Sequence, residues 1–222
     1  MSQISPTPLP PHAGRPLRTA GVPLDTASAA MILVHGRGAT AESILELTRV
    51  LPAPGFAFLA PQAAGGTWYP QSFLAPIPLN EPGISSGLSV IDALVASVAA
   101  AGIPAERTML LGFSQGACLS SEYVARRGAR IGGLAALSGG LIGPDETPRD
   151  YPGALAGTPV FLGCSDVDSH IPRERVELTA KVLGRMGAEV DMRLYPGMGH
   201  TVNQDEIDAV RAMMERVGTS YR

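Results

Sequence analysis

Clusters of positive charge are absent from this sequence. The 17 Lys and Arg residues are outnumbered by 20 Asp and Glu residues, which gives a formal net charge of −3, and the basic residues are scattered along the chain. A nucleic-acid-binding surface needs basic side chains gathered on one face. Nucleic acid is therefore excluded as an expected partner.

Cysteine is also scarce. The two cysteines, Cys118 and Cys164, lie in apolar surroundings and lack the spacing of metal ligands. Buried free thiols are the ordinary state of such residues. We therefore expect no disulfide, no zinc or other metal, and no cofactor.

Long hydrophobic runs are missing as well. The first residues, MSQISPTPLPPHAGRPLRT, contain neither a basic start nor an apolar run of signal-peptide length. No segment reaches the roughly 20 apolar residues that cross a bilayer. The sequence predicts no membrane span and a cytoplasmic location.

The length of the chain, 222 residues, suits one well-filled α/β domain. Residues 1–16 contain five prolines and little apolar periodicity, which predicts an extended, poorly packed N-terminal arm. We expect a single domain over residues 17–222.

Short apolar runs alternate with stretches of helical period along most of the chain. The runs predict strands at residues 29–36, 56–61, 108–114, 131–139, 158–166 and 189–197. The stretches between them predict helices at residues 41–51, 87–102, 117–128, 173–187 and 204–218.

Near-continuous apolar strands are typical of a parallel sheet that helices cover on both faces. The expected fold class is α/β, with a three-layer, doubly wound and mainly parallel sheet. In such sheets functional residues gather at the carboxyl ends of the strands. Two long connections, 61–83 and 139–157, interrupt the alternation and are rich in Pro and Gly or irregular in pattern.

The stretch LLGFSQGA places Ser114 between Gly112 and Gly116, in the pattern G-x-S-x-G. The pattern alone is weak, but here it follows an apolar strand and precedes a helix, as a nucleophile elbow requires. The glycines relieve crowding at a sharp turn, and the helix that starts at Gln115 directs free amides at the site. Ser114 is therefore the candidate nucleophile.

A serine hydroxyl needs an adjacent base, and the chain has four histidines. His12 lies in the predicted arm, His35 can brace the loop after the first strand, and His170 is a surface or supporting residue. His200 follows the last predicted strand in the glycine-rich segment YPGMGH, where a loop can hold its imidazole over the serine. We therefore predict His200 as the base.

The acid that orients this imidazole is expected at another strand end. Asp166 and Asp168 both follow the strand PVFLGC, and strand geometry does not choose between them. Either one gives the order Ser, Asp, His along the chain, which is the order of α/β-hydrolases.

A tetrahedral intermediate needs backbone N–H donors for its oxyanion. The elbow predicts the amide of Gln115 as one donor and the amide of Arg37, in the loop VHGRGAT, as the other. The Arg37 side chain is expected to be solvated; turned inward, it would favour an anionic group of the substrate.

Five segments together resemble the phospholipase/carboxylesterase family of small α/β-hydrolases, which includes acyl-protein thioesterases and compact bacterial carboxylesterases. They are ILVHGRGAT, TWYPQSF, LLGFSQGA, VFLGCSDVDSHIP and YPGMGH. The resemblance covers residues 30–215, and this chain departs from it only slightly, with Ala117 where the family usually has glycine. It implies an α/β-hydrolase fold, and no insertion is long enough for a separate cap domain.

The resemblance also implies roles for two residues. The family's aspartate stands four residues before a proline, which selects Asp168 before Pro172 and leaves Asp166 as the alternative. Trp68, in TWYPQSF, would line the acyl or alcohol pocket. The alternative is that Trp68 only packs the loop over the sheet.

The sequence therefore predicts a metal-independent serine esterase that hydrolyses small, short-chain carboxylic esters through an acyl-enzyme. Two alternatives stay open: an acyl-thioesterase or lysophospholipase acting on long acyl chains, and a non-catalytic ligand-binding protein on the same scaffold. A dienelactone hydrolase is disfavoured, because those enzymes carry cysteine in place of Ser114. The apolar helices would allow a homodimer.

Overall fold

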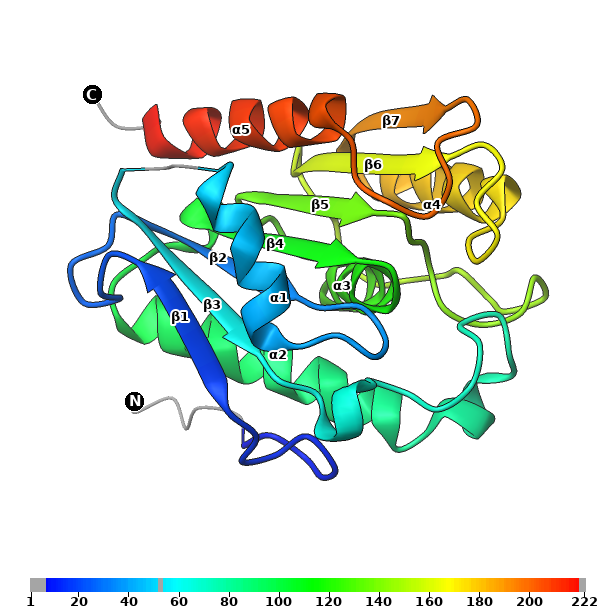
Figure 1. Ribbon diagram of the computed structural model, residues 1–222, viewed down its shortest axis with the longest axis horizontal. Helices are drawn as coiled ribbons and strands as arrows, with labels where there is room; N and C mark the ends of the chain where they lie inside the picture. The colour runs from blue at the N-terminus through cyan, green and yellow to red at the C-terminus, as the bar shows by residue number, and fades with distance from the viewer. Residues whose placement is uncertain (1–6, 52–53, 220–222) are drawn as a thin grey trace.

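A seven-stranded sheet forms the centre of the computed structural model, which describes residues 7–51 and 54–219 (Figure 1). The strands are β1 (Leu17–Gly21), β2 (Ala29–Val34), β3 (Phe56–Pro61), β4 (Thr108–Phe113), β5 (Gly133–Leu137), β6 (Pro159–Ser165) and β7 (Glu189–Tyr195). Their order across the sheet is β1-β3-β2-β4-β5-β6-β7. Every neighbouring pair is parallel except β1 with β3, which is antiparallel.

Helices cover both faces of this sheet. They are α1 (Ala41–Leu45), α2 (Gly83–Ala100), α3 (Gln115–Arg127), α4 (Arg173–Arg185) and α5 (Gln204–Thr219). Apolar side chains of α1 and α5 belong to one buried cluster, and those of α2, α3 and α4 belong to another. The three-layer, mainly parallel α/β-hydrolase fold predicted from the sequence is confirmed.

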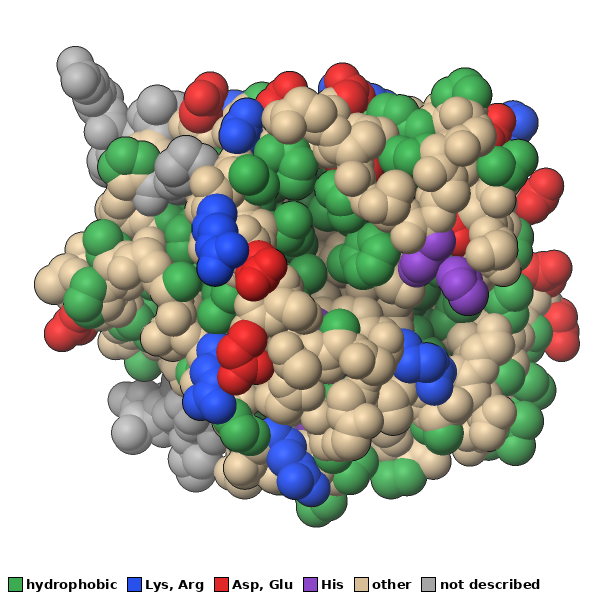
Figure 2. Space-filling model, in the orientation of Figure 1, with side chains coloured by type: hydrophobic (Ala, Val, Ile, Leu, Met, Phe, Trp, Pro, Cys, Tyr) green, Lys and Arg blue, Asp and Glu red, His purple; other side chains and the backbone are tan. Residues whose placement is uncertain are grey.

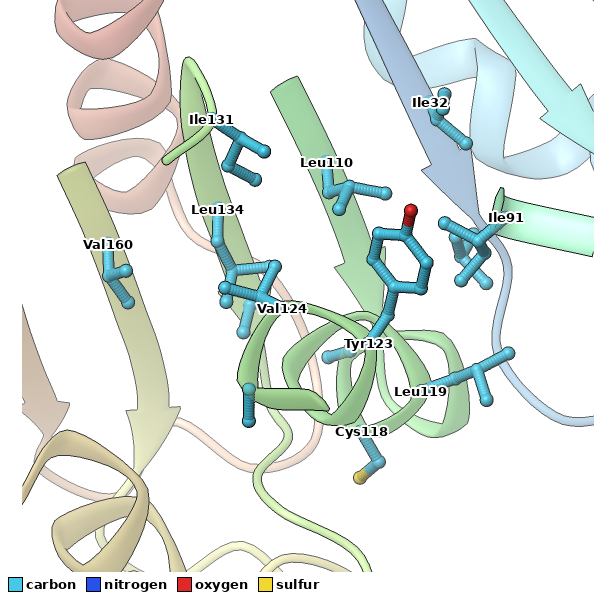
Figure 3. Close-up of a cluster of buried hydrophobic side chains, with 14 of the residues drawn as sticks. Ile32, Ile91, Leu110, Cys118, Leu119, Tyr123, Val124, Ile131, Leu134 and Val160 are labelled. Atoms are coloured by element: carbon cyan, nitrogen blue, oxygen red, sulfur yellow. The ribbon is translucent and has the colours of Figure 1, made fainter. Parts of the chain in front are cut away.

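The two buried clusters follow from the alternation of side chains along each strand. In β2, Ala30, Ile32 and Val34 contribute to the cluster under α2, α3 and α4. The intervening Met31 and Leu33 contribute to the cluster under α1 and α5. Figure 3 shows how α3 presents Tyr123 and Val124 to side chains of the central strands in the first cluster.

Strand β1 was not predicted, and the reason lies in its exposure. Its sequence LRTAG has no apolar run, because as an edge strand it pairs only with β3 and most of its residues are exposed. A buried parallel strand has two covered faces and therefore reads as continuously apolar. The six predicted strands all form.

The helices also form where they were predicted, with shifted ends. The α-helical part of the predicted segment 41–51 stops at Leu45 and continues as a 3₁₀ turn over Glu46–Arg49. Helix α2 begins at Gly83, four residues earlier than predicted, because the glycines at 83 and 87 weaken the helical pattern in the sequence.

Among the described residues, helix α2 alone has the length and mean hydropathy of a membrane-crossing segment. Its 18 residues come close to the roughly 20 that cross a bilayer, and half of the helix is buried inside the fold. Ile84, Ile91 and Val98 are completely buried in the core cluster. The apolar character of α2 is thus that of a core helix.

The sequence predicted an extended, poorly packed N-terminal arm over residues 1–16. For the described part, which begins at residue 7, that prediction is wrong. Residues 10–14 form a turn against α2, where the amide of Leu9 donates to Ser89 Oγ and the amide of His12 donates to Ser86 Oγ. His12 is only 3% exposed. Proline-rich composition indicated an extended chain, but tertiary hydrogen bonds fix this segment to the domain; residues 1–6 lie outside the described residues.

Candidate active site

Ser114 occupies a sharp turn between β4 and α3, at the carboxyl end of the strand. Its backbone has φ 54° and ψ −120°, a conformation that non-glycine residues rarely adopt. The amide of Ser114 donates to the carbonyl of Leu137 on the neighbouring strand, at 2.9 Å. This turn is the strained nucleophile elbow that the sequence predicted.

The two glycines of the elbow are required by close packing. A Cβ on Gly116 would lie 2.0 Å from the Val34 carbonyl oxygen, and a Cβ on Gly112 would lie 2.4 Å from the Gly116 carbonyl oxygen. Both obstacles are backbone atoms, which cannot rotate away. The turn can therefore approach β2 at Gly116, and α3 can pack back on β4 at Gly112, only with glycine at these positions.

His200 lies between β7 and α5 and brings the other two predicted residues together. Its Nε2 is 2.9 Å from Ser114 Oγ, and its Nδ1 is 2.7 Å from Asp168 Oδ2. The three residues come from three different strand ends, after β4, β6 and β7. They form an unbroken hydrogen-bonded chain from carboxylate to hydroxyl.

Asp168 is held for this role by its own turn. Its side chain is fully buried, and its Oδ1 accepts hydrogen bonds from the amides of His170 and Ile171 at 2.8 and 3.1 Å. Although burial alone favours the neutral acid, the hydrogen bonds from His200 and these amides hold the pKa of the Asp168 carboxyl below its ordinary value.

Asp166 has a different partner. Its Oδ1 accepts from the amide of Gly197, at 2.8 Å, in the loop that carries His200. Of the two aspartates that the sequence left open, the structure therefore pairs only Asp168 with His200.

The two predicted oxyanion donors border the same space. Gly36, beside Arg37, packs against the elbow, since a Cβ on it would lie 3.3 Å from Ser114 Cβ. Arg37 and Gln115 both line the cavity that contains Ser114. In the described part of the chain neither of their amides has an acceptor, so both are free to bind a negatively charged oxygen.

The cavity above Ser114 has a volume of about 470 Å³ and opens to solvent. Figure 2 shows it as a hollow bordered by histidine side chains. Its apolar lining comes mainly from Tyr69, Phe73, Phe113 and Ile171. A cavity of this size holds a small organic ligand.

Trp68 does not line this cavity, which corrects the role that the family resemblance implied. Its side chain is completely buried, its Nε1 donates to the carbonyl of His35 at 2.9 Å, and its ring lies against Gly87 of α2. The alternative interpretation, packing of the loop over the sheet, describes Trp68. The next residues of the same segment, Tyr69 to Phe73, provide the wall instead.

Gln115 and Arg37 are two of the side chains that fix this wall, and neither role was predicted from the sequence. Gln115 accepts from the Trp68 amide at 2.8 Å and donates to the Tyr69 carbonyl at 2.8 Å. The Arg37 guanidinium is not merely solvated, because it donates to the carbonyls of Tyr69, Pro70 and Gln71 at 2.6–2.9 Å. The only signal in the sequence was the length and irregular pattern of the connection 61–83, which indicated that contacts from other segments fix it.

Two buried histidines hold the start of the same segment. His35 Nε2 accepts from the Ala63 amide and His12 Nδ1 accepts from the Ala64 amide, at 3.1 and 3.0 Å. His35 was predicted to brace the loop after its own strand, where its Nδ1 lies 2.7 Å from the Gly36 carbonyl oxygen. Its contact with Ala63 was not predicted, and His12 was predicted to lie in a loose arm. Burial lowers the pKa of both imidazoles and keeps them neutral.

The remaining histidine and the two cysteines lie around the three hydrogen-bonded residues, and the Cys164 thiol donates to Asp168 Oδ2 at 3.7 Å. His170 is exposed, lines the cavity and packs edge-on against His200, with ring centroids 4.7 Å apart. Cys118 and Cys164 are buried free thiols, as expected. Burial raises the pKa of each thiol to about 12, so neither is a thiolate at neutral pH.

Comparisons with known proteins agree with this geometry. A family model described as Phospholipase/Carboxylesterase matches residues 21–217. Acyl-protein thioesterase 1 of Gibberella zeae is 34% identical over 120 residues, which make up 52% of this chain and 50% of the relative. The chain thus spans about half the length of the curated relatives it matches.

Solved structures extend the similarity over nearly the whole chain. The crystal structure of a phospholipase/carboxylesterase from Dyadobacter fermentans has a TM-score of 0.87 and 41% identity, covering 91% of this chain and 97% of that one. The crystal structure of esterase PE8 has a TM-score of 0.74 and 25% identity, covering 91% and 98%.

Proposed function

Since the chain belongs to the phospholipase/carboxylesterase family of hydrolases, we propose that it hydrolyses carboxylic esters through an acyl-enzyme on Ser114. The observation that carries this proposal is the pair of hydrogen bonds that joins Ser114 to His200 and His200 to Asp168, at 2.9 and 2.7 Å. A serine hydroxyl with an oriented imidazole becomes a nucleophile at neutral pH.

In the first half of the proposed reaction, His200 removes the proton of Ser114 as Oγ attacks the ester carbonyl carbon. The buried Asp168 carboxylate stabilises the imidazolium that forms and keeps Nε2 directed at the serine. His200 then gives the proton to the departing alkoxide, which leaves as the alcohol. The acyl group remains on Ser114.

In the second half, His200 takes a proton from a water molecule that attacks the acyl-enzyme. The carboxylic acid leaves, and the proton returns to Ser114 Oγ. Both halves pass through a tetrahedral intermediate with a negatively charged oxygen. The unpartnered amides of Gln115 and Arg37 are the donors we assign to that oxygen.

A short-chain ester is the substrate class that we favour. The cavity has a volume of about 470 Å³, and its lining includes the buried residues Tyr69, Phe73 and Cys118. Each methylene group that fits into an apolar pocket adds about 0.8 kcal/mol to binding, so catalytic efficiency rises with chain length until the pocket is full.

Hydrolysis of 4-nitrophenyl esters from acetyl to palmitoyl, by the wild type and by Ser114→Ala, tests this proposal. We expect kcat/KM to peak at a short chain and Ser114→Ala to lose at least about 10³-fold at every length. A peak at palmitoyl would contradict the short-chain proposal but leave the mechanism intact. Equal turnover by the two proteins would overturn the assignment of Ser114.

Thioester hydrolysis is the second candidate, because the curated relatives include acyl-protein thioesterases. The same hydroxyl, imidazole and oxyanion donors act on a thioester carbonyl. Turnover of acetyl and palmitoyl thiocholine beside the matching choline esters separates the two activities. A thioester preference at least tenfold above the chemical difference in reactivity would favour this candidate.

A further inference from the structure

The side chains of the cavity lining that can carry a charge near neutral pH are all basic, because burial raises the pKa of the Tyr69 phenol and the Cys118 thiol. They are Arg37, His170 and His200, and none of the lining residues in the described part of the chain is Asp or Glu. The chain as a whole has a formal charge of −3. A basic cavity on an acidic protein concentrates positive potential where the substrate binds.

Arg37 supplies the permanent charge of this cavity, and the structure fixes its position. Three N–H groups of the guanidinium donate to the carbonyls of Tyr69, Pro70 and Gln71. A guanidinium has five N–H donors, so two remain for a ligand. The ion pairs of the described residues do not include Arg37, so no carboxylate neutralises its charge.

His170 is a second donor on the border of the same cavity. Its backbone amide is committed to Asp168, which fixes the residue, while its exposed imidazole packs on His200. Figure 2 shows histidine side chains and a basic side chain close to each other at the border of the hollow. The Asp168 side chain lies behind His200, fully buried, and does not line the cavity.

We propose that Arg37 and His170 form an anion subsite and that the enzyme prefers esters carrying a free carboxylate, such as half-esters of dicarboxylic acids. This proposal rests on the proposed esterase function and adds its substrate class. A carboxylate in the cavity would accept charge-assisted hydrogen bonds from a pre-positioned guanidinium, which loses little freedom on binding. The uncharged ester of the same shape would leave the guanidinium donors without partners.

Matched substrate pairs test the subsite, because the members of each pair undergo the same reaction and differ in whether one carboxyl group is free or methylated. Each rate is divided by the spontaneous hydrolysis rate of the same compound, which removes the difference in intrinsic reactivity. Mono-4-nitrophenyl adipate and its methyl ester place the charge on the acyl side. 4-Acetoxybenzoate and its methyl ester place it on the alcohol side. We expect kcat/KM for the charged member of at least one pair to exceed that of the neutral member about tenfold at low salt.

Salt and variants then identify the source of the preference. The ratio within the pair should fall to below about threefold in 0.5 M NaCl, because screening weakens a partly exposed charge interaction. Arg37→Gln should abolish most of the ratio, and Arg37→Lys should retain more than half of it. Arg185→Gln, an exposed arginine in the last turn of α4, is the control that should leave the ratio unchanged.

The ratio remains informative if Arg37→Gln weakens the wall and lowers turnover of every substrate, since both members of a pair lose equally. His170→Gln, which does not remove a bond to the wall, should lower the ratio about two- to threefold. A wild-type ratio near one in both pairs, or an unchanged ratio in Arg37→Gln, would overturn the subsite. Failure of the esterase function itself would show differently, as no turnover of either member of any pair.

Discussion

The elbow that carries Ser114 and the segment that follows Trp68 border the same cleft, and the chain holds them in different ways. The elbow around Ser114 is fixed by its own backbone, through two glycines that contact β2 and α3 and through strand hydrogen bonds. The segment around Trp68 lacks regular structure for most of its length and is fixed by side chains from elsewhere in the sequence. A short local motif can therefore specify the elbow, whereas the opposite wall depends on residues 33 to 56 positions away.

The largest effect should come from Asp168, which is remote in sequence from the elbow but contacts the histidine that contacts Ser114. Asp168→Asn should lower kcat by about 10³- to 10⁴-fold, because an amide cannot stabilise the imidazolium of His200. Asp166→Asn is the matched control two residues away, and it should lose less than tenfold. Steady-state kinetics on one chromogenic ester measure both; equal losses would mean that the elbow does not depend on the Asp168 contact.

The elbow itself should tolerate no added atom at Gly116. Gly116→Ala should lower the free energy of unfolding by at least about 4 kcal/mol, because the new Cβ meets a backbone carbonyl at 2.0 Å. Gly184→Ala, on an open position of α4, should instead gain up to about 1 kcal/mol. Urea titration followed by circular dichroism checks both, and a mild Gly116→Ala phenotype would show that the turn can move.

The opposite wall should weaken through a single side chain on the elbow helix. Gln115→Ala leaves the Trp68 amide without an acceptor and removes one of three donors to the Tyr69 carbonyl, which should cost about 2 kcal/mol locally. Hydrogen exchange and limited proteolysis should report this opening within residues 62–82 while the strands stay protected. Gln204→Ala, an exposed glutamine at the start of α5, is the control; similar exchange in the two variants would contradict the role of Gln115.

The smallest expected effect is a difference in pH dependence: acid should destabilise the segment around Trp68 more than the elbow. Folding lowers the pKa of His12 and His35, chiefly through burial. The unfolded chain then binds more protons below pH 6.5, so stability falls as the pH drops from 6.5 toward the lowered values. Protonation also removes the acceptors of the Ala63 and Ala64 amides.

Between pH 7 and 5 we expect the free energy of unfolding to fall, because the unfolded chain takes up protons at both histidines before the folded protein does. After correction for intrinsic chemistry, amide exchange at residues 63–68 should accelerate relative to that of α3. Equal pH dependence in the two segments would contradict a histidine-held wall.

The same contrast explains what the sequence could and could not predict. The elbow, the strand ends and the order Ser, Asp, His are local patterns, so Ser114 and His200 could be chosen directly from the residues. Asp168 could not be separated from Asp166 by strand geometry, because both follow β6 and the choice depends on a turn closed by the amides of His170 and Ile171.

The wall was beyond sequence reasoning because its supports are single polar side chains in unrelated segments. His12 lies in a proline-rich stretch, and nothing local shows that its imidazole reaches Trp68 and Ala64. The family resemblance implied a place in the pocket for Trp68, with packing of the loop over the sheet as the alternative. Its indole instead donates to the His35 carbonyl and fills the space left by Gly87.

Covalent labelling tests the central claim most directly, namely that the elbow presents Ser114 as a nucleophile activated by His200. Intact-mass spectrometry after incubation with a fluorophosphonate should show one adduct on the wild type, mapped to Ser114 by peptide analysis. Ser114→Ala should stay unlabelled, and His200→Ala should label at least about 10²-fold more slowly. An adduct on another residue, or labelling of Ser114→Ala at the wild-type rate, would contradict it.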